Sequence, residues 1–295
     1  MESVLAERAA QTRMSKSADA VGNFVRKSPW HAFWGVVIVV LILMAALAPV
    51  IAPYDPIEPN VSRMRLAPDS QNWTGTDIVG RDVTSRLIYG ARASLFIAVS
   101  SVMLGTLIGG VWGLISGFVG GKFDLLSERF VEILLALPGL ILAYLLVLVL
   151  GANFWTVIGA LAISRVPTVV RVIRSVALSV RESMYVDAAL TIGASRARIV
   201  WKHIAPQCIA PLIVLVTVDI GGVIIAEASL SYLGVGIAPP TPSWGRMLGD
   251  ANPTLYPMWW LVAFPGLLIT LTVLAFNLFG DGIRDALDPR LRGTT

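Results

Sequence analysis

The sequence predicts an all-α membrane protein that crosses the bilayer six times. The first observation is composition: 56% of the 295 residues are hydrophobic, only 14% are charged, and the mean hydropathy is +0.74. This chain is therefore too apolar for an ordinary soluble domain. The second is a series of long uncharged stretches, separated by polar segments that contain proline or glycine. The third is that Lys and Arg gather in alternate segments, as they do in chains that cross a membrane repeatedly.

The N-terminal part divides into a polar tail, residues 1–30, and a first transmembrane helix, residues 31–53. No charged residue occurs between 32 and 53, and a helix of that length rises roughly 33 Å, enough to cross a bilayer core. A cleaved signal peptide is disfavoured because the leader is long and Pro49 follows the run of small residues at 46–48.

Residues 54–91 predict an irregular segment outside the cytoplasm that ends in an amphipathic helix leading into the membrane. Three prolines interrupt its first half, and glycines at 75 and 80 mark turns. Asp82, Arg86 and Tyr89 then recur at helical spacing before the next apolar run. We expect the Asp and Arg side chains of this segment to pair with one another at the membrane surface.

Residues 92–280 predict a core of five transmembrane helices. The second span, 93–121, is rich in glycine and small residues that allow close helix packing. The third, 126–150, contains Pro138 and is expected to kink there. A fourth span begins at 154, after a short turn, and is expected to leave the bilayer near Arg165 and continue as a cytoplasmic helix.

The last two spans are expected at 206–236 and 259–280. The loop between them, 237–258, contains prolines and glycines that forbid a long helix. Trp259 and Trp260, at the start of the sixth span, are typical of an interfacial aromatic belt. Residues 281–295 are expected to form a cytoplasmic tail.

One charged, strongly helical stretch interrupts the apolar core and predicts a helix, a tight turn and a second helix. Asp187, Ala188 and Ala189 lie on good helix-forming sequence; Gly193 can adopt the left-handed conformation that ends a helix, and Ser195 can cap the next one. The second helix is amphipathic, with basic residues beside apolar ones. These residues are Arg196, Arg198 and Lys202 and, on the apolar side, Ile199, Val200 and Ile204. The stretch is therefore expected to dock on another surface.

This stretch resembles the EAA loop of ABC-transporter permeases, in which an acidic residue, two alanines, three spacers and a glycine precede a run ending in Ile-x-Leu-Pro. Asp187, Ala188, Ala189, Gly193 and Pro206 fill those positions, with Asp in place of the usual Glu. Two further positions differ from the family pattern: His203 and Ala205 occupy the places where Ile and Leu are usual. The resemblance implies that residues 165–206 form a cytoplasmic loop that couples the spans to a separate ATPase subunit.

Three further stretches, beginning GTDIVGRDV, PPTPSWGRML and FNLFGDGIRD, resemble the dipeptide, oligopeptide and nickel branch of these permeases, and its second, C-type subunit. The resemblance implies the type I importer fold, and it implies that Asp77, Arg81 and Asp82 face the side that delivers substrate. It also implies a second homologous permease, two ATPase subunits that carry ATP and Mg, an external substrate-binding protein and a peptide substrate. Nickel chelates and glutathione-like peptides stay open as alternatives.

The distribution of basic residues predicts the orientation of the chain. Six of the 23 Lys and Arg residues fall in segments expected outside the cytoplasm: Arg63, Arg65, Arg81, Arg86, Arg92 and Arg246. The other 17 fall in the two tails and the segments expected inside, which predicts cytoplasmic N- and C-termini. The resemblance implies that the membrane is the inner membrane of a bacterium or archaeon. The net charge of +4 is thus explained by the bilayer, and no nucleic-acid partner is needed.

No catalytic, metal or cofactor site is expected in this chain. The stretch around Lys122 fails as a phosphate-binding loop, because Ser116 occupies the first glycine position and Phe123 replaces the Ser or Thr that would hold magnesium. Two distant histidines and the single Cys208 provide no metal-ligand cluster. ATP hydrolysis is therefore expected on a partner.

Three acidic residues fall within predicted spans: Glu132, Asp219 and Glu227. Such residues cost about 2.5 to 3.5 kcal/mol to insert. Asp219 and Glu227 are expected on nearly one face of the fifth span, where they either line a polar pathway or meet a partner subunit, or else bond to the backbone of a neighbouring helix. An ion-coupled secondary transporter would use these acids as its cation site, and that class of protein stays open. A membrane-embedded enzyme has less support, since no reacting constellation is found.

Overall fold

The computed structural model describes residue 26 and residues 28–251 and 258–287, and this part of the chain is all helical, apart from one isolated β-bridge. Five helices are long and apolar enough to cross a membrane, and the bent pair α5 and α6 gives a sixth span if counted as one. The predicted all-α membrane fold is confirmed. The helices are α2 (Pro29–Ala46), α3 (Ala48–Ile51), η1 (Val61–Arg63), α4 (Val83–Val119), α5 (Gly121–Leu135), α6 (Gly139–Leu150), α7 (Phe154–Arg181), α8 (Met184–Thr191), α9 (Arg196–Ile199), η2 (Val200–Ile204), α10 (Ala205–Tyr232), α11 (Trp244–Ala251) and α12 (Trp260–Leu287).

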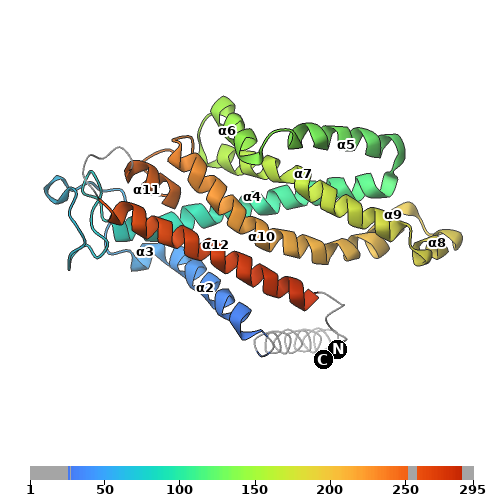
Figure 1. Ribbon diagram of the computed structural model, residues 1–295, viewed down its shortest axis with the longest axis horizontal. Coiled ribbons are helices and arrows are strands. Elements are labelled where there is room, and N and C mark those ends of the chain that lie inside the picture. Colours follow the sequence, from blue (N-terminus) through green and yellow to red (C-terminus); the bar gives the residue numbers. More distant parts are fainter. Residues whose placement is uncertain (1–25, 27, 252–257, 288–295) are drawn as a thin grey trace, which may run out of the picture.

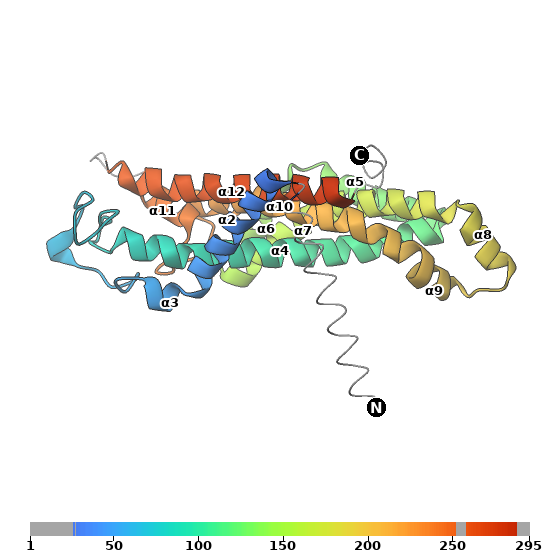
Figure 2. The ribbon, with the colours of Figure 1, turned by 90° about the horizontal axis from the view of Figure 1, so that it is seen from below.

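The helices form an elongated, flat bundle whose two ends carry different segments (Figures 1 and 2). The irregular segment between α3 and α4 and the short helix α11 lie at one end, and α8 and α9 lie at the other. Helix α2 crosses the bundle obliquely and packs on α12 and α4. The two segments singled out from the sequence therefore lie at opposite ends of the same long helices.

A stripe of glycines lets α4 and α7 pack in backbone contact. Gly105, Gly109, Gly113 and Gly117 recur every fourth residue, and a Cβ atom added at any of them would lie 2.6–2.8 Å from an atom of α7. Gly105 lies against Ala162 and Gly117 against Ala177, so the two helices run parallel. The close packing predicted from the small residues of this span is confirmed.

Helix α4 starts ten residues before the span predicted from the sequence. Asp82 caps it, with Oδ2 accepting the Ser85 N–H at 2.7 Å, and the helix then runs unbroken from Val83 to Val119. At 1.5 Å per residue its 37 residues extend about 55 Å, longer than a bilayer core. The predicted amphipathic helix is thus the first part of α4 rather than a separate element.

The third span is broken rather than kinked. α5 ends at Leu135 and α6 begins at Gly139, and the two are bent by 83°. Pro138 occupies the N-cap of α6, where its missing N–H is harmless, whereas inside a continuous helix it would remove one hydrogen bond and clash with the preceding turn. This explains why the chain breaks there.

Helix α7 does not end near Arg165, where the sequence analysis expected the fourth span to leave the bilayer, but continues to Arg181. Arg165 lies beside Gly105, whose added Cβ would be 3.3 Å from the Arg165 Cβ, and α4 stays uncharged for many residues beyond that point. Because α7 runs parallel to α4, Arg165 lies level with the uncharged part of α4. Its charge is met there by an ion pair with Asp219 of α10.

The remaining boundaries differ less from the prediction. α10 begins after the π-helical turn η2 and ends at Tyr232, and α12 continues to Leu287, beyond the predicted end of the sixth span. In the described part of the loop before α12, the eight-residue α11 is the only helix, in keeping with the prolines of this segment. Trp259 is 59% exposed, but Trp260 is buried and donates its indole N–H to the Thr76 carbonyl, so it does not belong to an aromatic belt.

Candidate functional site

The turn between α8 and α9 has the geometry predicted for the docking stretch. Gly193 adopts a φ of +80°, in the left-handed region. Its N–H bonds to the Leu190 carbonyl, and the Ala194 N–H bonds to the Ala189 carbonyl, both at 3.0 Å, which is the Schellman pattern of helix termination. Ser195 then caps α9, its hydroxyl accepting the Arg198 N–H at 3.4 Å. Helix, tight turn and helix are therefore confirmed.

One side of this α8–α9 loop (residues 184–204) is anchored in the bundle. Its buried side chains pack in one cluster with buried residues of α7, α4 and α10. Those of the loop are Val186, Ala189, Ile199 and Ile204, and those of the bundle are Leu114, Val169, Ile173, Ala177 and Cys208. The loop is thus in direct packing contact with α7 and α10.

The other side of the loop is an exposed surface that mixes apolar and basic side chains. Met184 is 90% exposed and Ile192 is 85% exposed, an unusual placement for large apolar residues in a soluble environment. Asp187, Ala188, Gly193, Ser195 and Arg196 are exposed around them, and Pro206 is exposed in the first turn of α10. Such a surface is suited to contact with another protein.

At the opposite end, the acids predicted to face the delivery side instead hold their own segment together. Asp77 accepts the backbone N–H groups of Val79 and Arg81 at 2.9 Å, and pairs with the Arg81 guanidinium at 2.6 Å and that of Arg86 at 3.6 Å. The predicted pairing of Asp and Arg is confirmed here. Asp77 and Asp82 are only 4% and 5% exposed, so neither carboxylate forms part of the outer surface.

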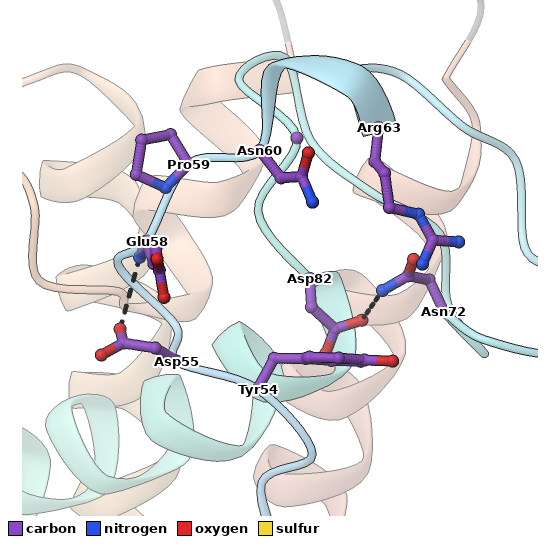
Figure 3. A pocket seen from close by; sticks show the side chains of 9 residues that line it. Tyr54, Asp55, Glu58, Pro59, Asn60, Arg63, Asn72 and Asp82 are labelled. Carbon is purple, nitrogen blue, oxygen red and sulfur yellow. Dashed lines mark hydrogen bonds between the residues drawn. The ribbon is translucent and has the colours of Figure 1, made fainter.

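A polar cavity of about 220 Å³ opens beside Asp82, which the sequence did not indicate (Figure 3). Asp82 also accepts a hydrogen bond from the side chain of Asn72, at 2.7 Å. Tyr54, Asp55 and Glu58 line the other side of the cavity. The cavity is built from residues more than 20 positions apart in sequence, so no local pattern could have predicted it.

The three acidic residues of the predicted spans each contact a different partner. Glu132 is exposed on α5 and pairs with Arg129 at 2.8 Å. Asp219 is buried and pairs with Arg165. Glu227 has no exposed surface and accepts the hydroxyls of Ser94 at 3.1 Å and Ser231 at 2.8 Å.

Asp219 and Glu227 therefore do not share a face, contrary to the sequence analysis. Eight residues at 100° each leave them about 80° apart around the helix, enough for one to meet α7 and the other α4. Both are bonded to neighbouring side chains, whereas the plainer interpretation expected bonds to the backbone of a neighbouring helix. Among the described residues, no group of three or more His, Cys, Asp or Glu is placed to hold a metal ion.

Comparison with known proteins agrees with this architecture. The family model of binding-protein-dependent transport system inner membrane components matches residues 109–293, and that of the N-terminal transmembrane domain of oligopeptide transport permease C matches residues 26–68.

Full-length relatives extend this match over nearly the whole chain. The chain is 40% identical to the oligopeptide transport system permease protein OppC of Bacillus subtilis, over 97% of this chain and 94% of the relative. It is 39% identical to the probable D,D-dipeptide transport system permease protein DdpC of Escherichia coli, over 91% and 90%. It is 40% identical to the di/tripeptide transport system permease protein DppC of Pseudomonas aeruginosa, over 92% and 95%. The chain therefore belongs to the family of binding-protein-dependent transport system inner membrane components.

Proposed function

We propose that this chain is a permease subunit of an ATP-driven importer of dipeptides or oligopeptides that works with an external binding protein. The observation that carries the proposal is the α8–α9 loop, which offers exposed Met184 and Ile192 on one side and is packed into the bundle on the other. A surface built in this way can receive a partner and pass its motion to the spans. Relatives named as oligopeptide, dipeptide and di/tripeptide permeases support a peptide substrate.

The packing supplies a route for that motion. Val186 and Ile199 of the loop are buried in one cluster with Ile173 and Ala177 of α7. α7 in turn lies in backbone contact with α4 along the glycine stripe. A shift of α8 by a docked ATPase subunit therefore moves α7 and α4 together, as packed elements in rigid contact do.

In this proposal ATP and Mg bind to two separate ATPase subunits and not to this chain. A second, related permease completes the pathway, and an external binding protein delivers the peptide. The membrane in this proposal is the inner membrane of a bacterium or archaeon. The Lys and Arg distribution supports a cytoplasmic position for the α8–α9 loop, the N-terminus and the C-terminus, and an outer position for the α3–α4 segment. The positions of the two segments at opposite ends of the bundle support this orientation.

The α3–α4 segment would form part of the surface that receives the binding protein. Asp77, Arg81 and Asp82 contribute by fixing its shape, since the two carboxylates bond to backbone N–H groups and neighbouring side chains of the same segment. Their replacement would alter docking through loop conformation rather than through loss of a direct contact.

The proposal is tested by purifying the chain from its native membrane and reconstituting the recovered assembly in liposomes. We expect ATPase subunits and a second permease to co-purify, and peptide-loaded binding protein to stimulate both ATP hydrolysis and uptake. Dipeptides, longer peptides, glutathione and nickel chelates are compared as substrates. Purification of the chain without ATPase subunits, with uptake that follows an ion gradient, would contradict the proposal and favour an ion-coupled carrier.

A further inference from the structure

All the fully exposed residues of α7 between 164 and 181 are polar, although several valines beside them are partly exposed. The exposed residues of this stretch are Thr168, Arg171, Ser175 and Ser179. They recur at intervals of three and four, so they form one stripe along the helix. On the N-terminal side of the stripe, the start of α6 lies against Ser164, since a Cβ added at Gly139 would lie 3.7 Å from the Ser164 carbonyl oxygen. The polar stripe therefore begins where α6 turns away from α7.

The register with α4 places the first two residues of this stripe, Thr168 and Arg171, level with the uncharged part of α4. Gly109 packs against Val169 and Gly113 against Val170 and Arg174, so Thr168 and Arg171 lie level with residues about 109 to 113 of α4. α4 has no charged residue from 93 to 119, and its exposed side chains there are apolar. An arginine that faced hydrocarbon at this depth would cost about 2.5 to 3.5 kcal/mol on insertion scales. The stripe must therefore face water or a polar protein surface.

The stripe also carries an unbalanced positive charge. The nearby Arg165 is paired with Asp219 and Arg174 with Asp124, but within the described parts of the chain Arg171 has no acidic partner. Arg171 is exposed, and Ser175 lies one turn further along the same face. A guanidinium flanked by hydroxyls binds carboxylates well, because it offers paired N–H donors in a planar fork.

We propose that this stripe is a wall of the water-filled translocation pathway and that Arg171 is a transient binding site for the carboxylate of the substrate. The inference rests on the proposed peptide import and adds the face and the residue that contact the passing peptide. Hydroxyls and one guanidinium recognise the carboxylate and backbone that all peptides share, and the stripe has no apolar pocket that would select a side chain. A single cation also allows release, which transport requires.

The test uses cysteine accessibility, which reports on water and charge without depending on uptake. The one native cysteine, Cys208, is 2% exposed and is replaced by alanine. Thr168→Cys and Ser175→Cys are then compared with Leu107→Cys, a control roughly level with Thr168 on the exposed face of α4, where the native side chain is 65% exposed. The complete transporter in nanodiscs, open to solvent on both sides, is treated with iodoacetamide and iodoacetate, and labelling of this chain is followed by mass spectrometry.

We expect iodoacetamide to modify Thr168→Cys and Ser175→Cys about tenfold faster or more than Leu107→Cys, because thiol alkylation requires the hydrated thiolate. Equally slow modification of all three would show that the stripe is sealed against another subunit and would overturn the proposal.

The carboxylate site is tested at Ser175→Cys by the ratio of two labelling rates, that of negatively charged iodoacetate to that of neutral iodoacetamide. Adding Arg171→Gln should lower the iodoacetate rate relative to the iodoacetamide rate about three- to tenfold, and Arg171→Lys should restore most of it. Arg129→Gln, which removes a 70% exposed arginine on α5, is the control and should leave the ratio unchanged. An unchanged ratio in Arg171→Gln would overturn the carboxylate site. Failure of the proposed function would appear separately, as absence of ATP-driven peptide uptake by the unmodified transporter.

Discussion

Helices α4 and α7 run side by side in the same direction, but they present opposite surfaces. From residue 96 onward every exposed residue of α4 is apolar: Phe96, Val99, Met103, Leu104, Leu107, Ile108, Val111, Ile115 and Val119. Between residues 164 and 181 of α7 the exposed residues are hydroxyl-bearing or basic, whereas Trp155 and Ile163, nearer its start, are exposed and apolar. The difference indicates that α4 faces hydrocarbon or an apolar partner along this stretch, whereas the second half of α7 faces water or a polar partner.

The two helices also differ in the residues that they direct toward the rest of the bundle. α4 makes its contact with α7 through four glycines, which bring no side chain to the interface. α7 carries four arginines, and three of them are satisfied within the chain. Arg165 pairs with Asp219, Arg174 with Asp124 at 2.6 Å, and Arg181 donates to the Gly117 and Phe118 carbonyls. Arg171 is the fourth, and its exposure distinguishes it from the other three.

Breaking the Arg165–Asp219 pair should have the largest effect on stability. Arg165→Leu leaves the buried Asp219 carboxylate without its counter-charge, and removal of one member of a buried pair costs about 3 to 5 kcal/mol. We expect a large drop in the unfolding temperature of the purified chain in detergent. The double variant Arg165→Leu/Asp219→Leu should recover most of the lost unfolding temperature. Arg129→Leu on the exposed face of α5 should change the unfolding temperature little. A double variant as unstable as the single one would show that the pair is not the source of the effect.

Adding a methyl group to the glycine stripe should have the next largest effect. In Gly113→Ala the new Cβ would lie 2.6 Å from the Val170 carbonyl oxygen, so backbone must move, at a cost of about 1 to 3 kcal/mol. Gly222→Ala in α10 is the matched control, because no atom lies within 4 Å of its added Cβ. It should stabilise the chain by up to about 1 kcal/mol through helix propensity. Equal unfolding temperatures for the two variants would contradict the close contact between α4 and α7.

Gly193 tests whether motion reaches α7 through the α8–α9 turn. Its surroundings are open, so only its φ of +80° restricts substitution. Gly193→Val should strain the turn by about 1 to 2 kcal/mol and lower the number of peptides transported per ATP hydrolysed. Gly193→Asn should keep the turn conformation and the number of peptides transported per ATP, because Asn tolerates the left-handed conformation. Normal coupling in Gly193→Val, with binding-protein docking unchanged, would remove the turn from the mechanism.

The smallest effect on stability is expected on the polar stripe. Thr168→Leu and Ser175→Leu change exposed side chains with no buried partner in the described structure, so unfolding should shift by no more than about 0.5 kcal/mol. Peptide uptake should nevertheless fall, because the pathway loses hydroxyl groups at those positions. Leu107→Ala on the exposed face of α4 should leave uptake unchanged, and an equal loss in all three variants would remove the functional distinction between the two helices.

The sequence was informative wherever the structure depends on local chemistry. A left-handed glycine followed by a capping serine specifies the α8–α9 turn through contacts within a few residues of each other. The glycine periodicity of the second span likewise indicates close packing without saying which helix lies opposite. Asp82 was placed at the start of a helical pattern, and the structure shows that it caps that helix.

Features that depend on contacts between distant residues could not be predicted. Arg165 was taken as the membrane boundary because it is the first charge of its span, and its partner, Asp219, lies more than 50 residues further along the chain. The sequence predicts only a kink at Pro138, whereas the structure has a break of 83°. The sequence does not show that α6 must turn to pack on the N-terminal half of α7. The polar stripe was also missed, because its residues alternate with the buried ones that face α4.

The most direct test of the account is whether a nucleotide-driven change at the α8–α9 loop alters solvent access to α7 and not to α4. Iodoacetamide labelling of Ser175→Cys and Leu107→Cys is measured in the complete transporter, first without nucleotide and then with ATP and vanadate to trap the ATPase subunits. We predict that trapping changes the labelling rate of Ser175→Cys severalfold and leaves that of Leu107→Cys unchanged. Identical rates at Ser175→Cys in both states would contradict the account, because the loop would then move without changing the surface of α7.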